Sequence, residues 1–191
     1  MTLVSQRKKY SETEYLDFEN KSKHRHEYIN GFLRRMGYAS HNHETIVANL
    51  IRLLGNHYFG QDYTVLGSNR LVYVPDCEKY YYPDVTVVKG KSNFKEFKGK
   101  MVATLNPYLI VEVLSDSTSE IDRSEKLECY QKIESLQYYF IVSQDSKNIQ
   151  IYSRTDDPKF WLSGLFNAND EYININDNKL RIDHIYHQIE F

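Results

Sequence analysis

The spacing of apolar residues in the first third of the chain predicts two helices and a β-hairpin. A capping-box pattern that begins at Ser11 predicts a short helix to about Asn20. Residues 26–36 alternate between apolar and polar side chains around Asn30-Gly31, a dipeptide typical of tight hairpin turns. In residues 42–59 the apolar side chains recur at helical spacing, which predicts an amphipathic helix.

The remainder of the chain has the pattern of strands around one further helix. Strands are expected near residues 64–74, 82–89, 108–114, 137–142 and 148–153. The run 108–114 is apolar apart from Glu112, as is typical of a strand buried on both faces. Ser117, Thr118 and Ser119 offer caps for a helix to about Ile133, and residues 152–191 predict short strands and a helix. This order predicts an α/β fold with a mixed central sheet.

Composition and charge narrow the class of protein. The chain has 191 residues, which fits one domain spanning 1–191. Its 26 acidic and 24 basic side chains give a net charge of −2, which disfavours non-specific coating of nucleic acid and leaves phosphate binding to a local patch. No apolar run is long enough to span a membrane or to form a signal peptide. Cys77 and Cys129 are not spaced for zinc, so we expect free thiols in a reducing cytoplasm.

Two carboxylates carry the strongest chemical signal. Asp84 opens the apolar run 85–88, and Glu112 lies inside a strand whose neighbouring residues are apolar. A carboxylate buried alone is costly, so Glu112 needs a cation, a metal or a raised pKa. Two acids on adjacent strands would make an oxygen-rich site suited to Mg²⁺ or Mn²⁺. For either acid alone a structural role is the more common one, as a turn cap for Asp84 or an arginine partner for Glu112.

The helix that follows Glu112 brings a cation to the same region. Lys126, Cys129, Tyr130 and Ile133 share one helical face, which should draw the lysine stem toward the sheet. Asp122 precedes this stripe by one turn. A lysine that reaches solvent from the border of the stripe is an equally good interpretation of the spacing.

Several short segments follow one another in a specific order along the chain. They are Arg25-His26-Glu27-Tyr28-Ile29-Asn30-Gly31, Tyr82-Pro83-Asp84-Val85 and Val111-Glu112-Val113-Leu114-Ser115, followed by Ser117-Thr118, Asp122 and Lys126. Together they resemble the Uma-type restriction-endonuclease family, within the PD-(D/E)XK nuclease-like superfamily, and the resemblance runs from about Tyr10 to Ile151. His43, at the start of the helix expected over 42–59, also fits the family pattern.

The resemblance implies a restriction-endonuclease-like αβββαβ core and metal-dependent cleavage of DNA. It implies that Asp84 and Glu112 bind Mg²⁺ or Mn²⁺, with Glu27 as an additional acid near the metal, although spacing alone gives Glu27 no special status. The superfamily lysine, two residues after the glutamate, is replaced by Leu114. The resemblance suggests that Lys126 supplies the missing ammonium and completes the catalytic set. Because double-strand cleavage often uses two copies of a site, a homodimer is also expected.

Cations near the candidate site offer contacts to DNA phosphates. Lys89, Lys91, Lys95, Lys98 and Lys100 fall between the strands of Asp84 and Glu112, and a loop there would reach a DNA backbone. Lys21, Lys23 and Arg25 precede the predicted hairpin, and Arg34 and Arg35 end it. Each of these residues, taken alone, is more often a solvated surface charge.

Two other functions use the same residues. One is a non-catalytic module that binds nucleic acid or protein on a nuclease core, which Leu114 and the acidic net charge favour. The other is a phosphatase or small-nucleotide hydrolase, which relies on the same metal chemistry.

Overall fold

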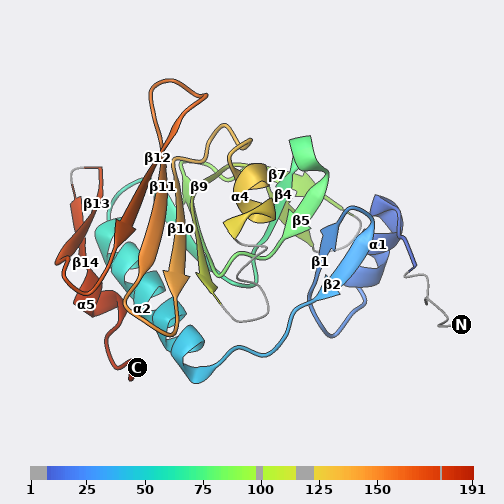
Figure 1. Cartoon of the computed structure of the whole chain (residues 1–191). Helices are drawn as coiled ribbons and strands as arrows, with labels where there is room; N and C mark the ends of the chain where they lie inside the picture. The colour runs from blue at the N-terminus through green and yellow to red at the C-terminus, as the bar shows by residue number, and fades with distance from the viewer. Residues whose placement is uncertain (1–7, 98–100, 115–122, 177) are drawn as a thin grey trace, which may run out of the picture.

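The computed structural model describes residues 8–97, 101–114, 123–176 and 178–191 (Figure 1). Its helices are α1 (Glu12–Glu19), α2 (His41–His57), the 3₁₀ turn η1 (Pro75–Cys77), α4 (Glu125–Tyr130) and α5 (Ile182–Ile185). Its strands are β1 (His26–Ile29), β2 (Phe32–Arg35), β3 (Tyr63–Gly67), β4 (Leu71–Val74), β5 (Lys79–Tyr81), β6 (Val85–Lys89), β7 (Phe94–Glu96), β8 (Val102–Thr104), β9 (Pro107–Leu114), β10 (Tyr138–Ser143), β11 (Ile149–Arg154), β12 (Trp161–Phe166), β13 (Tyr172–Ile175) and β14 (Asn178–Arg181).

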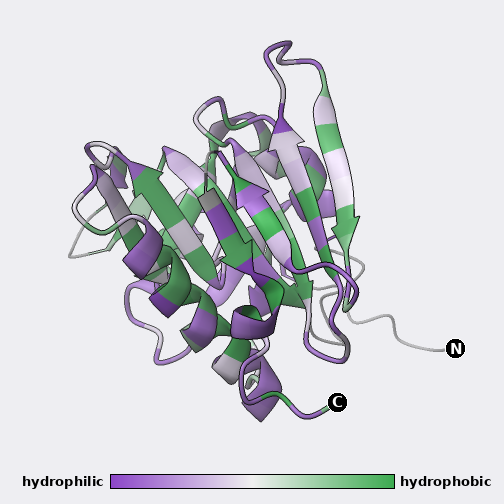
Figure 2. Cartoon of the chain, turned by 90° about the vertical axis from the view of Figure 1, so that its left-hand side faces the viewer, coloured by the Kyte–Doolittle hydropathy of each residue, from purple (hydrophilic) through white to green (hydrophobic). Residues whose placement is uncertain are grey.

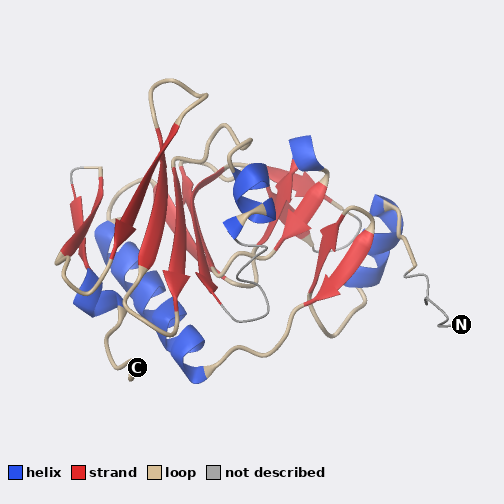
Figure 3. Cartoon of the chain, in the orientation of Figure 1, coloured by secondary structure: helices blue, strands red, loops and turns tan. Residues whose placement is uncertain are grey.

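The strands form two mixed sheets and a small hairpin (Figure 3). Sheet A has the order β2-β1-β5-β4-β8-β7, sheet B has the order β12-β11-β10-β9-β6-β3, and β13 pairs with β14. The pairs β9–β10 and β4–β8 are parallel, and the remaining ladders are antiparallel. Apart from the sheet A strands inserted between them, α2, β3, β6, β9, α4 and β10 form an αβββαβ core around sheet B in chain order, so the predicted mixed α/β fold is confirmed.

The chain crosses between the two sheets at two points, and one of the predicted strands is divided between them. Residues 64–74 form β3 in sheet B and β4 in sheet A, because a turn at residues 68–70 interrupts them. At the second crossing β5 ends in sheet A at Tyr81 and β6 begins in sheet B at Val85, so the strand predicted over 82–89 begins later than expected. Pro83, which stands between them, has no N–H group for a ladder hydrogen bond. The crossing from one sheet to the other therefore takes place at Tyr82-Pro83-Asp84, next to a predicted site residue.

Strand β9 is the centre of the hydrophobic core. All eight of its residues are buried, as the apolar run predicted. Leu109, Val111 and Val113 pack with α2, whose apolar and polar faces are visible in Figure 2. Ile110 and Leu114 pack on the opposite face with α4 and strands of both sheets. Glu112 shares this second face, because side chains alternate along a strand.

The predicted local signals at the N-terminal end are also present. Ser11 and Glu14 form the reciprocal capping box that begins α1. Asn30 and Gly31 have φ values of 53° and 88°, which a tight hairpin turn requires. The proposed caps Ser117–Ser119 lie outside the described residues, and α4 begins later than expected, at Glu125. No helix in the described ranges is long and apolar enough to cross a membrane.

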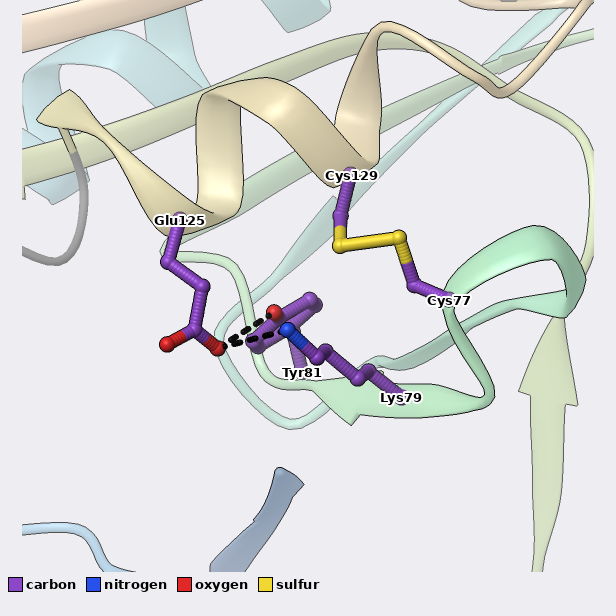
Figure 4. The surroundings of a disulfide bond; sticks show 5 residues. All are labelled: Cys77, Lys79, Tyr81, Glu125 and Cys129. Carbon is purple, nitrogen blue, oxygen red and sulfur yellow. Dashed lines mark hydrogen bonds and ion pairs between the residues drawn. A yellow bond between two sulfur atoms is a disulfide. The ribbon is translucent and has the colours of Figure 1, made fainter. Parts of the chain in front are cut away.

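The two cysteines form a disulfide, so the expectation of free thiols was wrong. Cys77 ends η1 and Cys129 lies on α4, with their Cα atoms 5.9 Å apart (Figure 4). Beside the bond, the Lys79 ammonium and the Tyr81 hydroxyl both donate to Glu125. A separation of 52 residues does not by itself predict that two cysteines pair. The packing of α4 against the β4–β5 connection brings Cys77 and Cys129 together. The argument from free thiols for a reducing compartment therefore no longer holds, and the cytoplasmic location stays a prediction.

Candidate active site

The residues predicted for the site line one cavity of about 480 Å³. Glu27 comes from β1 in sheet A, Asp84 from the crossing between the sheets, Glu112 from β9 in sheet B and Lys126 from α4. All of them are buried, with exposed fractions of 3% for Glu27, Glu112 and Lys126 and 7% for Asp84. The fold therefore gathers four residues that are distant in sequence around a single hollow.

Asp84 is held against the end of β9. The ladder between β6 and β9 pairs Val85 with Val111, so Asp84 lies one step beyond it, beside Glu112. The backbone N–H of Val113 donates to Asp84 Oδ2 over 2.7 Å, and His43 Nε2 lies 3.2 Å from the same oxygen. Both contacts fix the Asp84 carboxylate at the cavity wall. Hydrogen bonds of this kind orient a carboxylate that acts as a metal ligand or a base.

Lys126 lies between two buried carboxylates. Its Nζ donates to Glu112 Oε1 over 2.9 Å and lies 3.3 Å from Glu27 Oε1. The Tyr130 hydroxyl, one turn further along α4, donates to the same Glu112 oxygen over 2.9 Å. Burial of the Tyr130 phenol and the nearby Glu112 charge raise its pKa well above the ordinary value, so the hydroxyl stays protonated as a donor. The predicted contact between Lys126 and Glu112 is confirmed, and the catalytic role of the lysine stays a prediction.

Glu27 is engaged by donors on both of its oxygens. Arg34 binds Oε2 through Nε, at 2.9 Å, and through its NH2 group, while the Tyr82 N–H donates to Oε1 over 3.2 Å. Burial alone would raise the pKa of Glu27, but the charges of Lys126 and Arg34 outweigh it and hold that pKa below the ordinary value. Glu27 is therefore an ionised anchor for two cations.

Comparison with known proteins assigns the chain to a family. Residues 12–176 match the Uma2 family, described as "Putative restriction endonuclease". The chain belongs to this family. The resemblance recognised in the sequence is thereby confirmed, and it extends further toward the C-terminus than expected.

The chain is also similar to two curated proteins and to a solved structure. The chain is 31% identical to the uncharacterised protein sll1609 of Synechocystis sp., over 90% of this chain and 96% of that one. It is 35% identical to slr1290 of the same organism, over 85% and 83%. A crystal structure described as "a putative nuclease belonging to DUF820" from Anabaena variabilis aligns with a TM-score of 0.72 at 16% identity, covering 91% of this chain and 95% of that chain. At this identity the structural likeness shows a shared fold.

Sequence reasoning missed the cation that anchors Glu27. Arg34 faces Glu27 directly in the β1–β2 ladder. A two-residue turn at Asn30-Gly31 fixes that register, and opposite charges at facing positions of a hairpin stabilise each other. The signal was thus present in the sequence once the hairpin was recognised. His43 was noted without a role, and its contact with Asp84 depends on how α2 packs against sheet B, which spacing does not reveal.

The carboxylate oxygens of Asp84 and Glu112 fit a hard divalent cation whose other ligands are mainly water. Asp84 and Glu112 present carboxylate oxygens at adjoining strand ends facing a cavity, and Mg²⁺ needs only one or two such ligands because it retains several waters. Among the described residues no group of three or more His, Cys, Asp or Glu side chains is placed to hold a metal. The Lys126 ammonium lies between Glu27 and Glu112, and both Glu27 oxygens accept from protein donors. Direct ligation by Glu27 stays a prediction, one that requires these donors to move.

The lysines expected to contact DNA do not line this cavity where the structure describes them. Lys95 on β7 forms an ion pair with Glu12 and lies over the Tyr73 ring, with Nζ 3.7 Å from its centroid. Strand β7 is one edge of sheet A, whereas β1 and β2 lie at the opposite edge, beside the site. Lys95 therefore lies away from the cavity, and its contact with DNA phosphates stays a prediction. Lys98, Lys100 and Asp122 lie outside the described residues.

Proposed function

We propose that the chain is a divalent-metal-dependent endonuclease that hydrolyses phosphodiester bonds in DNA. One observation carries the proposal: Lys126 is hydrogen-bonded to buried Glu112 at the wall of a cavity that Asp84 also lines, in a chain of the Uma2 family. Leu114 occupies the position of the superfamily lysine, and the ammonium reaches Glu112 from α4 instead.

The proposal gives each of these residues a role. Asp84 and Glu112 would hold Mg²⁺ or Mn²⁺, which supplies an activated water and polarises a phosphate oxygen. Lys126 would stabilise the negative charge that develops on the phosphate, because a cation fixed in a site of low water content needs little reorganisation. Tyr130 and Glu27 hold Lys126 and its partner in place, and His43 orients Asp84.

The experiment is cleavage of supercoiled plasmid by the pure, folded protein with Mg²⁺ or Mn²⁺. We expect metal-dependent nicking or linearisation that is lost in Asp84→Asn and retained in Asp145→Asn, an exposed aspartate away from the cavity. Calorimetric titration with Mn²⁺ should show binding that disappears in Glu112→Ala. Wild-type protein that cleaves neither plasmid, linear duplex nor single strands above the Asp84→Asn background would overturn the proposal.

A second function, a non-catalytic binding module, is favoured by the charge balance of the site. Lys126 and Arg34 neutralise Glu112 and Glu27 within the protein, so these two acids are stable without a metal. A module of this kind would bind nucleic acid equally well with and without divalent ions and would leave the plasmid intact.

A further inference from the structure

A second hollow adjoins the candidate active site, and the residues around it are cationic. Its volume is about 300 Å³, and it shares the lining residues Arg25, Arg35 and 36–38 with the larger cavity. Lys23 and His24 complete its titratable lining, and no acidic residue of the described chain lines it. The hollow thus continues the site outward along a surface of positive charge.

The cations of this hollow differ in their partners from the cations that contact the acid cluster of Glu27, Asp84 and Glu112. Arg34 and Lys126 are neutralised by carboxylates. Lys23, Arg25 and Arg35 have no carboxylate partner among the described residues, so their charges are available to an anion. Arg25 is also held in position: it donates to the backbone carbonyl of Ser68, which leaves further N–H groups of its planar fork for a phosphate.

An aromatic side chain projects beside these cations. Tyr38 belongs to the segment between β2 and α2, which crosses from one sheet toward the other (Figure 1), and 98% of its surface is exposed. It lines both hollows. A phenol exposed to this extent gains nothing from core packing, whereas an aromatic ring beside a cationic groove is the arrangement on which single-stranded nucleic acids stack their bases.

We propose that the second hollow binds a phosphodiester group of an unpaired nucleic-acid strand, while Tyr38 stacks on an adjacent base. The strand would run from Lys23, Arg25 and Arg35 toward Asp84 and Glu112. The proposal rests on the nuclease function above, since it names the form of the substrate that reaches the same site. A stacked base must be out of its duplex, so the site favours single-stranded, frayed or bulged substrates over intact duplex.

Binding without divalent ions tests this subsite separately from cleavage. Fluorescence anisotropy of a labelled single strand, in the presence of EDTA, should show about 5- to 150-fold weaker binding for Tyr38→Ala, the range for one stacked base. Phe59→Ala, which removes another exposed aromatic ring outside both hollows, is the matched control and should bind as wild type does.

The charges are tested by the dependence of binding on salt. Lys23→Gln combined with Arg35→Gln should reduce the slope of log K against log[salt] by about 1.4, or 0.7 for each lost phosphate contact on a single strand. Lys132→Gln with Lys159→Gln, both exposed and outside the two hollows, should leave it unchanged. Unchanged affinity in Tyr38→Ala, an unchanged slope, or equal losses on duplex and single strand would overturn the subsite. Wild-type protein that gives these binding results but cleaves neither plasmid, linear duplex nor single strands would instead overturn the nuclease function alone.

Discussion

Replacement of Lys126 by methionine is the most informative perturbation of this molecule. The change keeps the length of the side chain and removes the ammonium that lies between Glu112 and Glu27. Because Lys126 is 97% buried, water cannot replace it, and removing one partner of such a buried pair destabilises a protein by about 3–5 kcal/mol. For a chain of this size that corresponds to a fall in melting temperature of about 6–20 °C.

The loss of stability in Lys126→Met should depend on pH, and the nearby carboxylates determine the direction of this dependence. Lys126 is the foremost charge that lowers the pKa of Glu27, so the variant raises that pKa relative to wild type. Protonation then relieves the uncompensated charge, and the difference in unfolding free energy should be smaller at about pH 5 than at about pH 8. Urea unfolding at both pH values, with the disulfide intact, measures it.

Two controls make the measurement decisive. Lys132→Met removes an exposed lysine just beyond α4 and should change stability by no more than about 0.5 kcal/mol. Adding Glu112→Gln to Lys126→Met should recover part of the loss, because it removes the charge left without its cation. A Lys126→Met variant as stable as the Lys132→Met control, or a loss equal at both pH values, would refute the reasoning.

Further predictions concern the disulfide, the acid limit of stability, Tyr130 and assembly. Reduction, or replacement of both cysteines by alanine, should lower the unfolding free energy by about 4 kcal/mol, since the bond closes a loop of 52 residues, and urea titrations with and without a dithiol measure this. Because the pKa of Glu27 is lowered in the folded protein, its ionisation contributes stability at pH values above the ordinary Glu pKa. This stability should be lost as the pH falls through the folded-state pKa of Glu27, which an acid titration followed by circular dichroism measures. Tyr130→Phe removes a buried hydrogen bond to Glu112 and should cost about 1.5–3 kcal/mol by chemical denaturation; a loss below 0.5 kcal/mol (about the noise of such mutants) contradicts that role. Sedimentation velocity tests the expected homodimer, which a monomer at all concentrations would refute.

Much of the fold follows from local pattern, because the decisive signals are short in range. The capping box at Ser11, the turn at Asn30-Gly31 and the apolar run of β9 each depend on a few neighbouring residues, and each is present in the structure. The alternation that puts Glu112 on the α4 face is likewise local.

The features that escaped sequence reasoning depend on contacts between distant segments. The sheet to which each strand belongs depends on which strand edges meet, and this pairing cannot be predicted from Pro83 or from the turn at 68–70 alone. The disulfide requires α4 to pack on η1, and the contact of His43 with Asp84 requires α2 to lie across sheet B. Spacing could not choose between a buried and a solvated lysine at position 126, because that outcome depends on acids contributed by two other strands.

The crossing at Tyr82-Pro83-Asp84 has a consequence for the order in which this molecule folds. The hydrogen bonds of the cavity wall join residues far apart in the chain: 55 positions between Tyr82 and Glu27, 41 between His43 and Asp84, and 29 between Val113 and Asp84. Each such contact closes a long loop, and the entropy cost of closing that loop must be overcome before the contact stabilises the folding chain. Hairpins such as β1–β2 and β10–β11 can therefore form early, whereas the acid cluster is assembled only when the two sheets dock, and we expect φ-values near zero for substitutions at Asp84.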